Sequence, residues 1–162
     1  MKNQLKSLLL CALLLVTFAV PAMAEDAVSS ASVADFYADA ALTGDDLMNA
    51  INSFTGTYLV STTNPDGTPN TAFFVFSMIK YEDAYYLQLG LAPNQSVINL
   101  EANGKGMCVY GMNPGEGDKP YPVKGARIWF DSEIEPAVLE ALQANARQGA
   151  MFYRVTEIRP VG

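Results

Sequence analysis

The sequence predicts a small, mostly-β barrel with a few short helices. From residue 57 onward, runs of apolar and β-branched residues alternate with turn signals. Tight turns such as Asn64-Pro65-Asp66-Gly67 join neighbouring runs, and they require antiparallel pairing because a parallel crossover takes a dozen residues or more. The chain has 162 residues, of which 50% are hydrophobic and 10% aromatic, and this is enough for one core.

Residues 1–24 have the pattern of an export signal. Lys2 and Lys6 give a positive start, residues 8–20 form an apolar stretch that is short for a bilayer span, and Ala22-Met23-Ala24 has the small-residue pattern of a cleavage site. We predict cleavage after Ala24 and a periplasmic or secreted product without membrane contact. A retained membrane anchor is the alternative.

Composition excludes several classes of function. The chain has no histidine, which removes histidine-ligated metal and haem sites and nucleophiles activated by imidazole. Cleavage would leave 8 basic and 17 acidic residues, a net charge of −9, which argues against nucleic acid as a partner. Cys108 would be the remaining cysteine, so no internal disulfide is expected, and its apolar neighbours predict a buried thiol. No metal site is predicted.

The predicted elements begin with a flexible tail at residues 25–32, and residues 33–162 are expected to form one domain. The apolar spacing over residues 33–41 predicts a helix, and a second short helix begins with Asp45 and Asp46 in its first turn. Three strands are then expected at residues 57–63, 71–79 and 85–91, in an antiparallel meander.

The second half alternates helices with strands. Residues 94–104 predict a short helix because Asn94 is a good N-cap and Gly104 a good C-terminal stop. Strands are expected at residues 106–112 and 123–130, an amphipathic helix after Pro136, and a last strand at residues 151–158. The total is about six strands.

Residues 57–70, Thr-Tyr-Leu-Val-Ser-Thr-Thr-Asn-Pro-Asp-Gly-Thr-Pro-Asn, resemble the opening hairpin of the pyridoxamine 5'-phosphate oxidase-like family, the FMN-binding split barrels. In that family the first strand is followed by a turn of Asp-Gly-x-Pro type. The later order also fits: a long second strand, a third strand, a short helix, a strand through Cys108, and Val123-Lys124-Gly125-Ala126 at a glycine-containing later strand. The resemblance covers about residues 45–160 and implies a six-stranded antiparallel split barrel.

The resemblance also implies a homodimer with FMN in a groove between the subunits. The isoalloxazine ring would lie against backbone of the second and third strands. The positions that correspond here are Thr71, Ala72, Phe73, Leu89, Gly90 and Leu91. Plain core packing is the other interpretation of these apolar positions, and for Phe73 and Leu89 it is the favoured one.

The phosphate is expected at the start of the helix over residues 94–103, near Gln95, Ser96 and Asn99, because a helix N-terminus offers free backbone N–H groups. Many family members place Lys or Arg beside Ser or Thr there, whereas this chain has Gln95-Ser96, so the contact would be made by neutral donors. Lys124 is the basic residue most favoured to compensate. Arg127 lies three residues further along the same predicted strand, so it faces the opposite side and at most one of the two can point into a given groove. Arg154 and Arg159 could reach a phosphate across a dimer interface, but surface roles are more typical of them.

These observations favour an exported FMN-binding protein that acts in electron transfer or in reduction of a small molecule, with the cofactor supplying the chemistry. The alternative is a dimeric small-ligand-binding or structural module on the same fold without a cofactor. No catalytic residue is identified. Glu133 and Glu135 beside Asp131 are interpreted as a solvated acidic patch, and Gly115-Glu116-Gly117 as a surface loop.

Overall fold

The computed structural model describes residues 37–90, 93–113 and 124–162. The helices are the short 3₁₀ helix η1 (Ala38–Ala40), α2 (Gly44–Asn52), α3 (Gln95–Asn103) and α4 (Pro136–Gln143). The strands are β1 (Thr57–Thr63), β2 (Pro69–Phe73), β3 (Phe76–Tyr81), β4 (Ala84–Leu89), β5 (Lys105–Gly111), β6 (Gly125–Asp131) and β7 (Met151–Arg159). The predicted signal, the tail and the Gly115-Glu116-Gly117 loop lie outside the described residues.

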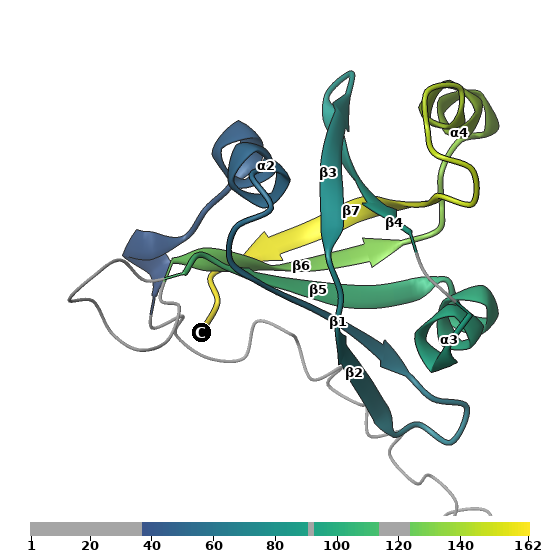
Figure 1. Cartoon of the computed structure of the whole chain (residues 1–162), viewed down its shortest axis with the longest axis horizontal. Coiled ribbons are helices and arrows are strands. Elements are labelled where there is room, and N and C mark those ends of the chain that lie inside the picture. Colours follow the sequence, from purple (N-terminus) through teal and green to yellow (C-terminus); the bar gives the residue numbers. More distant parts are fainter. Residues whose placement is uncertain (1–36, 91–92, 114–123) are drawn as a thin grey trace, which may run out of the picture. The chain divides into compact units, whose positions relative to one another are not determined.

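The described strands form one seven-stranded sheet in the order β2-β1-β5-β6-β7-β4-β3, and each neighbouring pair is antiparallel (Figure 1). The edge strands β2 and β3 are separated in sequence by Phe74 and Val75 alone. In a flat sheet these edges would lie about 29 Å apart, at about 4.8 Å per strand. The connection from Phe73 to Phe76 can reach about 11 Å. The sheet therefore curls until the end of β2 lies close to the start of β3, which gives a barrel whose two edge strands are not paired with each other.

The predicted second strand, residues 71–79, is two strands in the structure. Residues up to Phe73 pair with β1, and residues from Phe76 pair with β4. Between them the Phe74 N–H donates to the Tyr58 carbonyl at 3.1 Å. The predicted order of the meander is correct, but the count of six is wrong because this stretch changes its partner midway.

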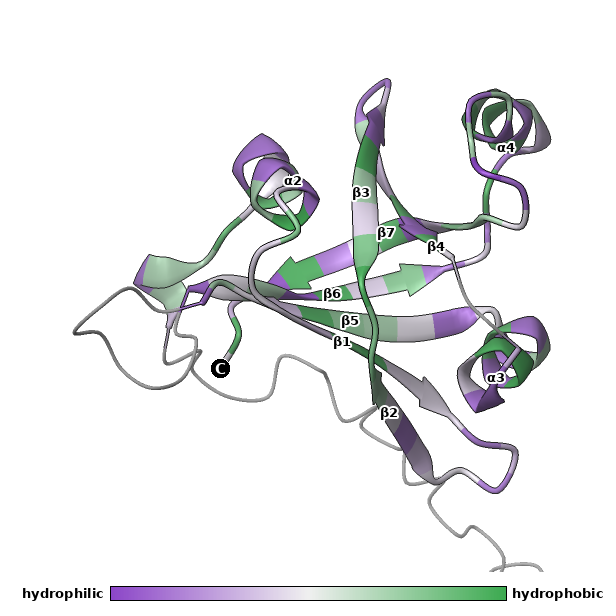
Figure 2. Cartoon of the chain, viewed as in Figure 1, coloured by the Kyte–Doolittle hydropathy of each residue, from purple (hydrophilic) through white to green (hydrophobic). Residues whose placement is uncertain are grey.

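The core lies inside the curled sheet. Inward residues alternate along β1, where Tyr58 and Val60 are buried. The Tyr58 ring meets Phe76 edge-on at 5.3 Å between centroids, and its hydroxyl donates to the Ile51 carbonyl at 2.7 Å. Because Ile51 belongs to α2, this contact fixes the helix over the core. Figure 2 shows the hydrophobic residues along β5, β6 and β7.

The helix before the first strand starts one residue earlier than Asp45, at Gly44, and carries both predicted aspartates in its first turn. Asp45 is held from the sheet side: the Tyr85 hydroxyl donates to it at 2.7 Å, and the Lys80 ammonium lies at 3.1 Å. In the described part of the predicted helix over residues 33–41, the structure has the single turn η1.

Helix α4 covers a second, smaller apolar cluster. Leu142 of α4 is buried with Tyr86 of β4 and Phe152 of β7. The amphipathic helix predicted after Pro136 is thus confirmed, and Pro136 is its first residue. Cys108 is fully buried in the main core, as predicted, and burial raises the pKa of its thiol well above the usual value.

Candidate functional site

The start of α3 is the most defined feature that sequence reasoning singled out. The Asn94 side chain accepts a hydrogen bond from the Val97 N–H at 3.2 Å, and the helix stops at Gly104 with a left-handed φ of 64°. Within the described part of the chain, the backbone N–H groups of Gln95 and Ser96 have no acceptor. Such free donors at the positive end of a helix suit an anion.

The side chains of Ser96 and Asn99 point into the protein. They are 3% and 1% exposed. The Asn70 side chain donates to Ser96 Oγ at 3.0 Å, while Asn99 donates to Thr62 at 3.0 Å and to Asn64 at 2.9 Å. This amide network fastens α3 to the β1–β2 hairpin, so these two side chains orient the helix and its free N–H groups.

The candidate ring-side residues fall into different environments. On β2, Thr71 and Phe73 are exposed and Ala72 is half-buried; the Phe73 side chain keeps 80% of its surface exposed. On β4, Leu89 is fully buried in the core. Gly90 is exposed just after the strand, and Leu91 lies outside the described residues.

Gly90 also lines a groove of about 730 Å³ that we name the Arg147 groove. Phe54 and Val75, which are 61% and 58% exposed, form apolar walls. The Arg147 guanidinium makes no hydrogen bond or ion pair with the rest of the described chain. The groove is defined by Phe54, Val75, Ser77, Gln88, Gly90 and Arg147.

Comparison with solved structures decides the fold. An FMN-binding protein from Syntrophomonas wolfei superposes with a TM-score of 0.52 at 16% identity, over 73% of this chain and 85% of that one. The chain has the split-barrel fold. HupZ from Group A Streptococcus gives a TM-score of 0.49 at 19% identity, over 74% and 94% of the two chains. The styrene monooxygenase flavin reductase from Pseudomonas putida gives 0.44 at 13% identity, over 66% and 80%.

Sequence comparison adds nothing to this result, since no family model and no curated protein matches the chain.

The basic residues of this split barrel lie apart from the start of α3. Lys124 directly precedes Gly125, the first residue of β6, which pairs with Gly111 at the end of β5. Helix α3 leads into the other end of β5, at Lys105. One chain therefore does not bring Lys124 beside Gln95, and its proposed role depends on a second copy. Arg127 donates to the Pro160 carbonyl at 2.7 Å, and Arg159 is paired with Glu157.

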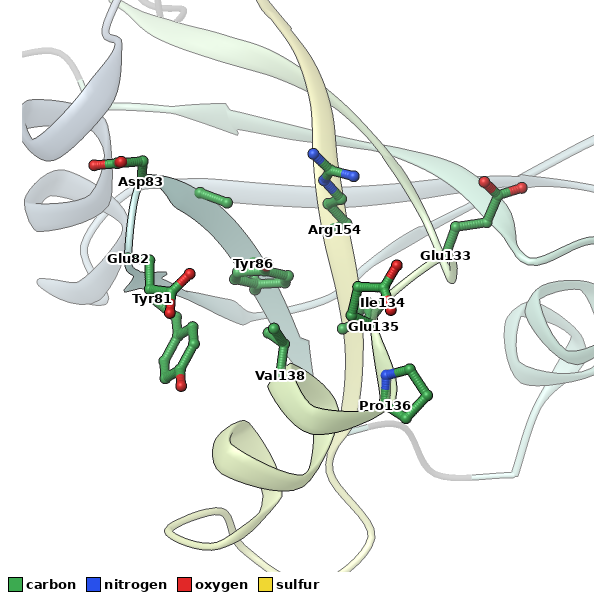
Figure 3. A pocket seen from close by; sticks show the side chains of 11 residues that line it. Tyr81, Glu82, Asp83, Tyr86, Glu133, Ile134, Glu135, Pro136, Val138 and Arg154 are labelled. Carbon is green, nitrogen blue, oxygen red and sulfur yellow. The ribbon is translucent and has the colours of Figure 1, made fainter.

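Arg154 lies in a different pocket of the split barrel, of about 610 Å³, between the β3–β4 turn and the start of α4 (Figure 3). Four acidic side chains line this acidic pocket: Glu82, Asp83, Glu133 and Glu135. Figure 3 shows Asp83 and Glu133 on opposite sides of the Tyr86 ring. Among the described residues, no set of three or more metal-ligating side chains could hold a metal ion.

Two tyrosines with raised pKa values belong to the core of the described chain. Burial raises the pKa of Tyr58 and of Tyr153 to about 12, and both side chains belong to the core. Neither lines the Arg147 groove or the acidic pocket. Among the residues that the structure describes, we identify no acid–base pair. No helix within the described ranges is long and apolar enough to cross a bilayer.

Sequence reasoning did not single out Arg147. Its neighbours Gln148 and Gly149 mark a turn after α4, which is a local signal, but the groove exists because this turn lies near Val75 and Gly90. This proximity is a tertiary contact, and no sequence pattern predicts it. Phe54 and Val75 could have been found as large apolar residues at element ends.

Proposed function

We propose that this split barrel is an exported flavin-binding protein that holds FMN between two copies of the chain and serves electron transfer or reduction of a small molecule. The observation that carries the proposal is the fold shared with the FMN-binding protein from Syntrophomonas wolfei. Export rests on the predicted signal over residues 1–24.

The start of α3 fits a phosphate in part. The two free backbone N–H groups, of Gln95 and Ser96, would hold it, and the buried Ser96 and Asn99 side chains keep them in position. In the described chain no Lys or Arg stands at this helix start, so the contact has the strength of neutral hydrogen bonds, about half that of charge-assisted ones.

The ring would lie along β2 and the end of β4. Phe73 presents a large exposed apolar surface there, which is suited to excluding water, and Gly90 leaves the backbone open to close approach. When bound, FMN supplies reversible uptake of electrons. The chain's own residues would bind FMN, orient it and shield it from water.

The proposed FMN site requires a second copy of the chain. An 80% exposed Phe73 on an edge strand is a surface that a partner would cover. The partner would also bring Lys124 or another cation to the phosphate, which a single chain does not do.

The experiment is flavin binding by the mature chain. We expect absorption near the flavin bands and quenched flavin fluorescence on titration with FMN. Ser96→Ala should weaken FMN by about 1 kcal/mol, as one neutral hydrogen bond that orients the helix start is lost. Gln95→Lys should tighten FMN by about 1 kcal/mol, because it adds a charge-assisted bond to the neutral backbone contacts.

Two controls sharpen this test. Riboflavin lacks the phosphate, so Gln95→Lys should leave its affinity unchanged. Ala102→Lys adds the same charge at the far end of α3, on an exposed position, and should leave FMN affinity unchanged. Failure to retain FMN, FAD or riboflavin at micromolar concentrations would overturn the flavin proposal.

The second candidate is a dimeric module that binds another small ligand or none. It is favoured by the network around Ser96 and Asn99, which is complete without a ligand: the described side chains leave no buried polar atom unsatisfied. A protein that remains dimeric and flavin-free would support this candidate.

A further inference from the structure

We propose that the acidic pocket binds a linear aliphatic polyamine, a flexible chain of methylene groups that carries two or more ammonium groups. This inference goes beyond the proposed flavin function and does not depend on it. The pocket lies at the β3–β4 turn, whereas Gly90 follows the other end of β4. None of the residues proposed to bind FMN lines this pocket.

Carboxylates stand on two separate walls of the pocket. Glu82 and Asp83 belong to the turn between β3 and β4, while Glu133 and Glu135 belong to the segment that leads from β6 into α4. Figure 3 shows the two pairs on either side of Tyr86. Within the described chain, none of these four side chains has an ion pair or a hydrogen bond. A ligand with an ammonium group toward each wall would give them partners.

The floor between the two walls is apolar. The Tyr86 ring, Ile134 and Val138 line it, and Ile134 and Val138 pack against the small cluster that contains Tyr86. The methylene groups of a polyamine would cover this floor and remove apolar surface from water. A metal ion has no such apolar part, and among the described residues no set of three or more metal-ligating side chains could hold one.

The Tyr86 hydroxyl is a polar group without a partner in the described chain. The side chain is 6% exposed, yet its hydroxyl makes no hydrogen bond. Because the described residues contain no unsatisfied polar side-chain atom that is fully buried, this oxygen must reach the surface. Tyr86 lines the acidic pocket, so the hydroxyl opens into it. There it can accept a hydrogen bond from an ammonium group that lies over the floor.

The size and the charge of the pocket agree with such a ligand. About 610 Å³ lies within the range typical of ligand sites, roughly 300–1,000 Å³. Arg154 is the basic residue that lines the pocket, against four acidic ones, so the pocket attracts cations and repels anions. Figure 3 shows the Arg154 guanidinium directed away from Val138 on the floor.

Three amines that differ in their number of ammonium groups test the charge. n-Butylamine carries one, putrescine carries two on a chain of the same length, and spermidine carries three. They are titrated by calorimetry into the flavin-free protein at pH 7 and fixed ionic strength. Putrescine should bind at least about fivefold more tightly than n-butylamine, and spermidine more tightly still, because the second wall is then engaged. Equal affinities for n-butylamine and putrescine would overturn the proposal.

Tyr86→Phe tests the hydroxyl without disturbing the core. The variant keeps the ring and should weaken spermidine about fivefold, the effect of one neutral hydrogen bond. Its free energy of unfolding should equal that of the native protein, since the described chain makes no hydrogen bond to this hydroxyl. An unchanged spermidine affinity would contradict the placement of the ligand over Tyr86.

Charge variants locate the site. Glu82→Gln on one wall and Glu135→Gln on the other should each weaken spermidine about threefold, and Arg154→Gln should tighten it about threefold, because a repelling charge is lost. Asp46→Asn is the matched control, since it removes an exposed carboxylate outside the pocket and should leave the affinity unchanged. An equal loss in Asp46→Asn would overturn the proposal in favour of a general attraction to the acidic chain. Weaker binding by Arg154→Gln would also overturn it.

Failure of this proposal is distinguishable from failure of the flavin proposal. The amines are titrated without flavin, and FMN retention is measured separately. Spermidine binding that depends on Tyr86 and Glu135 supports the polyamine site even when no flavin is retained. FMN retention without binding of any of the three amines overturns the polyamine site alone.

Discussion

At the scale of single residues, a network of buried amides holds α3 against the β1–β2 hairpin. Asn99 is 1% exposed and uses its amide group fully: it donates to Thr62 and Asn64 and accepts from Gln95 at 2.8 Å. A buried amide without partners costs about 1–3 kcal/mol, so this position tolerates little change. The orientation of α3 therefore depends on side chains that never touch a ligand.

Asn99→Ala should lower the free energy of unfolding by about 2 kcal/mol, because it removes the hydrogen bonds of this amide to Thr62, Asn64 and Gln95. Urea denaturation followed by circular dichroism measures this. Asn103→Ala is the matched control on the same helix: its exposed amide donates to the Thr63 carbonyl, and the loss should stay below about 1 kcal/mol. Equal losses for both variants would contradict a special role for the buried network.

Asp45 gives a pH-dependent prediction. The Tyr85 hydroxyl, and after it the Lys80 ammonium, hold the pKa of Asp45 below its usual value. A lowered pKa in the folded state stabilises the protein above the unfolded value of about 3.9, and this contribution disappears as pH falls through the folded pKa.

The stability difference between the native protein and Asp45→Asn should therefore be present at pH 7 and vanish near pH 2. Asp46→Asn is the control in the same helical turn, without the link to Tyr85 and Lys80. Thermal unfolding of all three proteins across this range checks the prediction. A difference for Asp45→Asn that stays constant down to pH 2 would be inconsistent with it.

At the scale of helices and strands, the sequence predicted those features that depend on interactions between neighbouring residues. The ends of α3 follow from Asn94 and Gly104, whose cap and left-handed φ are properties of a few neighbouring residues. The division of the long second strand at Phe74 and Val75 could not be predicted, because it depends on β1 and β4 being available as partners on opposite edges. The same holds for the register shift between β6 and β7 at Trp129 and Phe130.

The junction of β5 and β6 is the element most sensitive to added volume. Gly125 opens β6 opposite Gly111, and a Cβ there would overlap the backbone carbonyl oxygen of Tyr110. Because backbone cannot swing aside as a side chain can, Gly125→Ala should cost about 3 kcal/mol of unfolding free energy. Gly90→Ala is the control, since its Cβ would meet nothing within 4 Å, and should change stability by less than about 0.5 kcal/mol. Urea denaturation with equal midpoints for the two variants would contradict this assignment.

At the scale of the whole molecule, the sequence led to the right fold class because alternation and turns recur along the chain. It led only partly to the candidate site. Gln95 and Ser96 could be predicted because the start of a helix has a sequence pattern. Arg147 could not be predicted, because it lies near Phe54 and Val75 only in the curled sheet. Leu89 lies in the core, as core packing predicts, whereas the same prediction for Phe73 is wrong, because its side chain is 80% exposed on the edge strand β2.

The proposed dimer belongs to this scale. Phe73→Ser should weaken self-association at least about tenfold, because a partner would no longer bury a large apolar side chain, and should leave monomer stability unchanged since the residue is 80% exposed. Sedimentation equilibrium measures the association. Thr68→Ser, an exposed change on the same hairpin, is the control. A native protein that sediments as a monomer at all concentrations would refute the dimer.

The position of β7 between β6 and β4 has a consequence for folding. Strands β2, β1, β5 and β6 make one half of the sheet and β4 with β3 the other, and β7 supplies the hydrogen bonds that join the halves, as between Tyr86 and Arg154. Until residues 151–159 are in place, the curl cannot close and the apolar interior stays open to solvent. We therefore expect slow folding, because closure needs β7, which follows the other six described strands in the sequence, and pairings between strands that are distant in sequence. Slow closure of the sheet would suit the export proposed above, because a chain must still be unfolded when it is threaded through a membrane.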